Sequence, residues 1–96
     1  MSKRFELKWK KRHAKKSPYL SEEGFDVHYA EPSQLPGYLF RLLPDTRHEF
    51  WVVDIWSPEG YNEFYGMVTE YPEHLRYAKH IANMIANCIK NHEKFC

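Results

Sequence analysis

The sequence predicts an α+β domain in which an antiparallel sheet of about four strands packs on one long C-terminal helix. Apolar residues alternate with polar residues in several short segments of the first two thirds, which is the period of a strand. A turn-forming segment separates two of these runs, and the last quarter changes to helical spacing. The chain has 96 residues, the size of one domain.

Near the N-terminus, Phe5, Leu7 and Trp9 alternate with charged residues. This period of two predicts a first strand with one charged face, although Phe5 and Trp9 also have the spacing of a short amphipathic helix. Residues 10–18 are charged and end at a proline, so we expect a loop there.

Residues 25–29 alternate in the same way and predict a further strand. The strongest hairpin joins residues 38–43 to residues 49–56 through Pro44-Asp45-Thr46-Arg47. Proline presets φ in this connection, and Asp45 can accept hydrogen bonds from its own backbone.

Residues 50–56 are mostly apolar at both odd and even positions, which predicts a central strand covered on both sides, at least in part. Residues 61–68 predict one more strand, although Gly66 weakens it.

The C-terminal segment predicts a helix over about residues 72–94. Pro72 and Glu73 suit a first helical turn, and Lys90 suits the last one. The apolar residues that follow helical spacing are Leu75, Ala78, Ile81, Ala82, Ile85, Cys88 and Ile89. We expect the side that includes Asn83 and Asn87 to face solvent.

Charge is unevenly distributed along the chain. Residues 1–16 hold eight of the 14 Lys and Arg residues, whereas residues 17–75 hold eleven of the 13 acids. We therefore divide the chain into a basic N-terminal arm, residues 1–18, and a single α+β domain, residues 19–96. Such asymmetry is typical of an interaction surface.

The candidate binding residues combine this basic arm with aromatic residues. Cations of the arm can neutralise phosphates, and an exposed Trp9 could stack on a base. For Trp9 we favour a place in the core, and the cations could instead bind an acidic protein surface. Tyr61 and Tyr65 belong to the residue type that favours interfaces. The candidates are Lys8, Trp9, Lys10, Lys11, Arg12, Lys15, Lys16, Tyr61 and Tyr65.

The acidic middle argues against a pure nucleic-acid binder, because eleven carboxylates around a sheet would repel phosphate. This favours a protein partner, such as a basic surface that normally holds nucleic acid. Ordinary solubilising charge explains the acids equally well.

Catalytic and metal motifs are absent from the sequence. The chain has neither a nucleophile elbow nor a phosphate-binding glycine loop. A ladder of His80, Met84, Cys88, His92 and Cys96 has the spacing of one helix face, but it lacks the close ligand pairs of structural zinc sites. We therefore expect no catalytic residues, no cofactor and no metal.

Residues 50–53 are the longest uninterrupted apolar run, far short of the roughly 20 residues that a membrane-spanning helix needs. Cys88 and Cys96, if on one helix, would be about 12 Å apart, too far for a disulfide. We expect a cytoplasmic protein without a membrane segment.

Short length, abundant aromatic residues, polarised charge and the lack of a catalytic motif together resemble small phage-encoded accessory proteins. The resemblance is one of style and transfers no residue roles. It implies a non-enzymatic protein that inhibits or modifies a nucleic-acid-processing enzyme, for example a host recombination nuclease such as RecBCD. The alternatives are a single-stranded or nonspecific nucleic-acid-binding module that uses the arm and, third, a metal-dependent enzyme.

Overall fold

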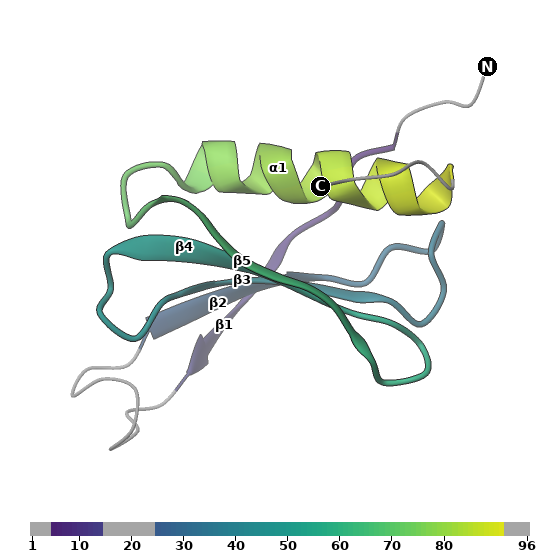
Figure 1. Ribbon diagram of the computed structural model, residues 1–96, viewed down its shortest axis with the longest axis horizontal. Coiled ribbons are helices and arrows are strands. Elements are labelled where there is room, and N and C mark those ends of the chain that lie inside the picture. Colours follow the sequence, from purple (N-terminus) through teal and green to yellow (C-terminus); the bar gives the residue numbers. More distant parts are fainter. Residues whose placement is uncertain (1–4, 15–24, 92–96) are drawn as a thin grey trace.

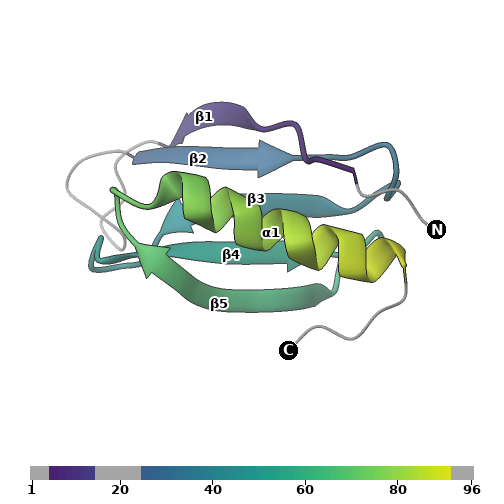
Figure 2. The same ribbon diagram turned by 90° about the horizontal axis from the view of Figure 1, so that it is seen from above.

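The computed structural model describes residues 5–14 and 25–91 (Figure 1). The elements are β1 (Lys10–Ala14), β2 (Phe25–Ala30), β3 (Leu39–Pro44), β4 (Phe50–Trp56), β5 (Asn62–Glu70) and α1 (Leu75–Lys90). Within these ranges the strands form one antiparallel sheet in the order β1-β2-β3-β4-β5, and α1 crosses one of its faces diagonally (Figure 2). The predicted α+β class is confirmed, with five strands instead of about four.

The predicted hairpin is confirmed as β3 and β4, which pair from Leu39 with Trp56 to Pro44 with Trp51. Its turn depends on Asp45, whose Oδ1 accepts the main-chain N–H groups of Glu49 at 2.7 Å and Phe50 at 3.1 Å. A turn carboxylate that satisfies two backbone donors fixes the register of both strands.

The main core lies between the sheet and α1. From the sheet, its most buried large side chains are Phe40, Leu42, Val53 and Ile55. From the helix they meet Ala78, Ala82 and Ala86, each fully buried. Because alanine side chains are small, the helix backbone can lie close to the sheet over this stripe.

Strand β4 lies between β3 and β5 and is buried from Trp51 to Ile55. Val53 and Ile55 belong to the core under the helix. Val52 and Asp54, which alternate with them, are buried at 1% and 2% exposure on the opposite face. The prediction of a strand covered on both sides is thus confirmed, although no helix covers that second face in the part of the chain that the structure describes.

The prediction for residues 5–14 is wrong in its details, and the part of the expected loop over residues 15–18 lies outside the described residues. The alternating segment 5–9 forms no strand, and the sheet instead begins at Lys10, within the expected loop. Phe5 and Leu7 are nevertheless buried at 9% and 7% exposure and join the main core. The apolar alternation therefore reflects burial of an extended segment without a strand partner.

Two asparagine side chains of α1 take the place of that missing strand partner. Asn87 accepts the main-chain N–H of Phe5 through Oδ1 at 3.0 Å and donates Nδ2 to the Phe5 carbonyl at 3.0 Å. Asn83 accepts the N–H of Leu7 at 2.7 Å and donates to the Phe5 carbonyl at 3.1 Å. The expected solvent-facing position of both asparagines is therefore wrong: Asn87 is 6% exposed and Asn83 is half-buried.

The helix begins at Leu75, later than predicted, because residues 71–74 form a turn on the sheet. The Pro72 carbonyl accepts the indole N–H of Trp51 at 3.4 Å, and the Thr69 hydroxyl donates to the His74 carbonyl at 3.2 Å. The helix ends at Lys90, and the expected extension over residues 92–94 lies outside the described residues.

The fold opposes protonation of His28 on β2. Its ring packs edge-on against Trp51, with the ring centroids 5.7 Å apart. Partial burial, and after it the positive charge of Lys79, lowers the pKa of His28 from its ordinary value.

We expect Asn87→Ala to lower the free energy of unfolding by about 1–3 kcal/mol, because it leaves the N–H of Phe5 buried without a partner. Urea denaturation of the variant measures this loss. The control is His80→Ala at an exposed position of the same helix, for which we expect a change within about 0.5 kcal/mol. Equal effects of the two substitutions would contradict the role of Asn87.

Stability should also fall as the pH drops below about 6.5, the ordinary pKa of histidine. The folded His28 resists protonation, so the unfolded chain binds more protons in this range and stability rises with pH. Urea denaturation at a series of pH values should show a shallower slope for His28→Gln than for the wild type. An unchanged slope for His28→Gln, or the same flattening in His80→Gln, would refute the assignment.

Candidate functional site

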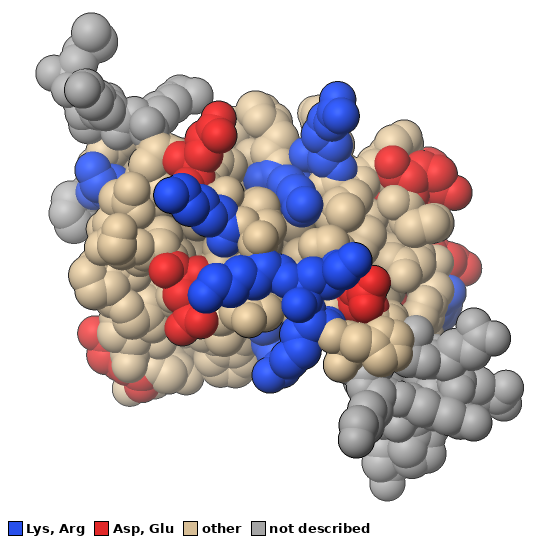
Figure 3. All heavy atoms as spheres, turned by 180° about the vertical axis from the view of Figure 1, so that it is seen from behind, with Lys and Arg blue, Asp and Glu red and all other residues tan. Residues whose placement is uncertain are grey.

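The first candidate surface lies along the β1 edge of the sheet. Figure 3 views the molecule from the side opposite to Figure 1 and shows Lys and Arg side chains gathered in a band, with a few acids among them. Residues 8–12 contribute four Lys and Arg residues at this edge, and all four are exposed. They are Lys8, Lys10, Lys11 and Arg12.

Strand geometry divides these cations between two faces, because successive side chains of β1 point to opposite sides. Lys10 lies opposite Tyr29, and Arg12 lies opposite Val27. Both therefore stand on the sheet face away from α1. Lys11 lies opposite His28 and thus on the helix side.

Asp26 neutralises part of the charge on the helix side. Its carboxylate lies 3.1 Å from Nδ1 of His13 and 3.9 Å from Nζ of Lys11. The hydrogen bond with His13, supported by the charge of Lys11, holds the pKa of Asp26 below its ordinary value. Lys8, Lys10 and Arg12 have no acidic partner within ion-pair distance among the described residues.

The cationic surface continues onto α1. Arg76 and Lys79 line a shallow hollow together with Trp9 and Asn83. The asparagine contacts bring residues 5–9 beside the helix, and so place these cations next to the arm. We call the combined set the basic surface: Lys8, Lys10, Lys11, Arg12, Arg76 and Lys79.

Acidic side chains interrupt the basic surface. Glu6 lines the hollow that holds Arg76 and Lys79. Glu31 lines a second hollow beside Lys8 and Lys10. The surface is therefore of mixed charge with an excess of cations.

The open face of the sheet carries a polar row that crosses every strand. Successive cross-strand partners are Lys10, Tyr29, Arg41, Asp54 and Tyr65. Cross-strand partners share a face, so this row joins the β1 edge to the β5 edge on the side away from the helix.

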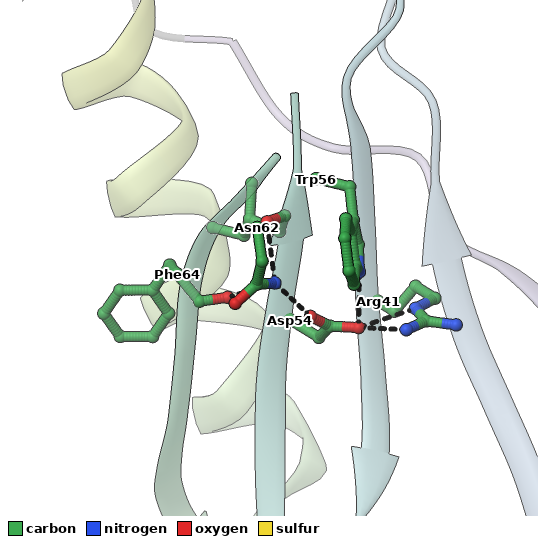
Figure 4. A network of polar contacts seen from close by, with 6 residues as sticks. Arg41, Asp54, Trp56, Asn62 and Phe64 are labelled. Carbon is green, nitrogen blue, oxygen red and sulfur yellow. Dashed lines mark hydrogen bonds and ion pairs between the residues drawn. The ribbon is translucent and has the colours of Figure 1, made fainter. Parts of the chain in front are cut away.

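An ion pair between Arg41 and Asp54 occupies the middle of the row (Figure 4). Nε of Arg41 donates to Oδ2 of Asp54 at 2.9 Å, and the indole of Trp56 donates to the same oxygen at 2.9 Å. The amide of Asn62 donates to Oδ1 at 2.7 Å. Three side chains donate hydrogen bonds to the oxygens of Asp54, so this carboxylate stabilises the sheet and is not free to bind a ligand.

The structure does not bring all the predicted site residues together. Trp9 is half-buried and packs against the main core, which favours its core interpretation over base stacking. Tyr65 lies on β5, across the sheet from Lys10 and about 19 Å away at roughly 4.8 Å per strand. Tyr61 lies just before β5. Lys15 and Lys16 lie outside the described residues.

Sequence reasoning missed Arg41, Arg76 and Lys79 as neighbours of the basic arm. Arg41 lines a hollow with Arg12 and Tyr29 on the open face. The pairing of β1 with β2 and of β2 with β3 brings Arg12, Tyr29 and Arg41 together, and no local pattern encodes these registers.

Among the described residues, no group of three or more His, Cys, Asp or Glu side chains could hold a metal ion. His92 and Cys96 of the predicted ladder lie outside these residues. Comparison with known proteins found no matching family model, no matching curated protein and no matching solved structure. Within the described ranges, α1 is too short and too polar to cross a membrane.

The Arg41–Asp54 pair should show strong energetic coupling. Arg41→Met and Asp54→Asn should each lower the free energy of unfolding. The loss in the double variant should be smaller than the sum of the two single losses by about 1–2 kcal/mol. A double-mutant cycle from urea denaturation measures this coupling. The exposed pair Arg47–Glu49, at 3.5 Å, is the control and should couple by less than about 1 kcal/mol. Additive losses at Arg41 and Asp54 would show that the interaction between the two side chains contributes nothing to stability.

Proposed function

We propose that this chain is a non-enzymatic binding protein whose basic surface docks on an acidic surface of a protein partner. The observation that carries the proposal is the cluster of six cations along the β1 edge and the neighbouring flank of α1. Cations on two separate elements, held beside each other by the fold, form a docking surface of defined shape.

The acids within the surface favour a protein over a nucleic acid as the partner. A phosphate backbone that follows the β1 edge would meet Glu6 and Glu31 as well as the lysines. A protein surface of mixed charge can place its own cations opposite these carboxylates. The partner that we propose therefore carries mainly acidic residues with a few basic ones.

We further propose that this partner is an enzyme or complex that acts on nucleic acid, with RecBCD as an example. Support comes from the division of charge between the arm and the middle of the chain, and from the resemblance in style to phage accessory proteins. The mechanism would be occlusion or redirection of the enzyme by surface contact, with the basic surface steering the encounter.

Direct binding of nucleic acid is the second candidate function. One observation favours it: although Trp9 packs against the core, its exposed part lines the same hollow as Arg76 and Lys79, so an aromatic edge and two cations lie together. In this case affinity should fall steeply as salt is raised, because each neutralised phosphate releases counterions.

The test is an affinity pull-down of the tagged chain from bacterial lysate, with and without nuclease digestion. We expect a discrete protein that survives digestion and is lost with the double variant Lys10→Glu, Arg12→Glu. The control variant Arg47→Glu, Lys90→Glu changes net charge by the same amount away from the β1 edge and should retain the partner. Circular dichroism checks that both variants fold.

Two outcomes would contradict the protein-partner proposal. If nucleic acid is recovered and the co-purifying proteins disappear on digestion, direct binding replaces it. If the same protein is captured equally by both charge variants, a partner exists but the basic surface does not hold it. A separate assay with purified RecBCD tests the proposed class of partner: it measures whether the chain binds the enzyme and inhibits its nuclease activity.

A further inference from the structure

The two edges of the sheet differ in chemistry. β1 has five residues, of which three are Lys or Arg. β5 has nine residues, and the stretch Phe64–Thr69 contains no charge. Among the described residues β5 pairs with β4 alone, and Figure 2 shows it as the outer strand of the sheet. The outer main-chain groups of such a strand can pair with another strand.

Exposed apolar side chains gather at the β5 edge on the open face of the sheet. Tyr65 and Met67 of β5 are 66% and 59% exposed. They lie opposite Asp54 and Val52, so both point away from the helix. Tyr61, which is 71% exposed, stands just before the strand. A cluster of this kind marks an interaction surface more often than a bare monomer surface.

The flank of α1 above β5 is apolar as well. Tyr77 and Met84 are 61% and 50% exposed. They are seven residues apart and therefore lie on one side of the helix. Tyr77 lines a hollow with Val68 and Thr69 of β5, which places this side over the β5 edge. The opposite flank carries the cations of the basic surface.

We propose that β5 is a homodimer interface, in which β5 of one copy pairs antiparallel with β5 of a second copy about a twofold axis near Gly66. The sheet would then continue from one copy into the other. Because antiparallel partners share a face, both helices would lie on the same side of this sheet. Tyr77 and Met84 of each copy would line the space between the two helices.

The side chains of β5 are complementary to themselves in this arrangement. Pairing about Gly66 places Tyr65 opposite Met67 of the second copy, and an aromatic ring beside a thioether is a favourable contact. Glu63 lies opposite Thr69, and Asn62 lies opposite Glu70, so no two acids face each other. Irregularities in the pairing with β4 fall at Glu63 and Val68, on either side of the regular stretch.

A second copy through β1 is excluded by the same reasoning. Pairing β1 with itself about Lys11 would bring Lys10, Lys11 and Arg12 against the same three cations, and other registers of so short a strand would still place several cations close together. Like charges directly opposite each other destabilise a strand pair. The proposal concerns β5 alone and is independent of the basic surface and its partner.

Sedimentation equilibrium of the full chain tests the proposal over a range of concentrations. We expect a dimer for the wild type and a monomer for the double variant Tyr65→Lys, Met67→Lys, in which lysines face each other across the axis. The control Gln34→Lys, Thr46→Lys adds the same charge at exposed positions away from β5 and should remain dimeric. A wild type that is monomeric throughout, or a double lysine variant that remains dimeric, would overturn the proposal.

Disulfide cross-linking tests the register without relying on loss of assembly. In a background with Cys88→Ser and Cys96→Ser, chains carrying Tyr65→Cys are mixed with chains carrying Met67→Cys. Directly opposed residues have Cβ atoms about 4.5–5.5 Å apart, close to disulfide geometry. We expect the mixed pair to oxidise faster than either variant alone. Equal rates for all three would show that this register does not form.

Discussion

The placement of the N-terminal segment depends on the hydrogen bonds that Asn83 and Asn87 make to its backbone. Phe5 and Leu7 are buried without a neighbouring strand, and their polar main-chain groups need partners in a dry environment. The two amides supply donor and acceptor together, as an edge strand would. With the segment fixed beside the helix, β1 starts at Lys10, and Lys8 lies on the described segment that packs beside α1.

The open face of the sheet is organised by a second polar anchor. Arg41 and Asp54 lie in the middle of a sheet surface that no helix covers in the described part of the chain. Trp56 and Asn62 complete the hydrogen bonds of the carboxylate, so the pair is held from several sides. The face combines an ordered polar centre with aliphatic residues such as Val27 and Val52, whose small exposure shows that neighbouring side chains already cover them.

Elements whose signals are local could be predicted from the sequence. The hairpin of β3 and β4 was predictable because Asp45 acts within five residues of its own position. The helix was predictable because alanine and isoleucine repeat along one stripe, although its start at Leu75 depends on contacts of the preceding turn with Trp51.

What could not be predicted depends on contacts distant in sequence. The partners of Phe5 are asparagines about eighty residues away, and asparagine on a helix ordinarily indicates a solvent-facing position. Likewise, β1 has no apolar alternation because it is an edge strand with cations on both faces, so its composition indicated a loop. The basic residues of the arm were visible in sequence. Their neighbours Arg76 and Lys79 depend on the asparagine contacts that bring the arm beside α1, and Arg41 depends on the pairing of β2 with β3.

The unlike edges of this sheet have a consequence for how far an assembly could grow. Sheets whose two edge strands can both pair with another molecule can polymerise into fibres, because each added molecule exposes a new edge strand of the same kind. Here, joining two copies through β5 would leave only β1 edges outward, and each of these carries three adjacent cations. Growth would therefore stop after one step, and the cations that we propose for partner binding would also limit the assembly to a closed pair.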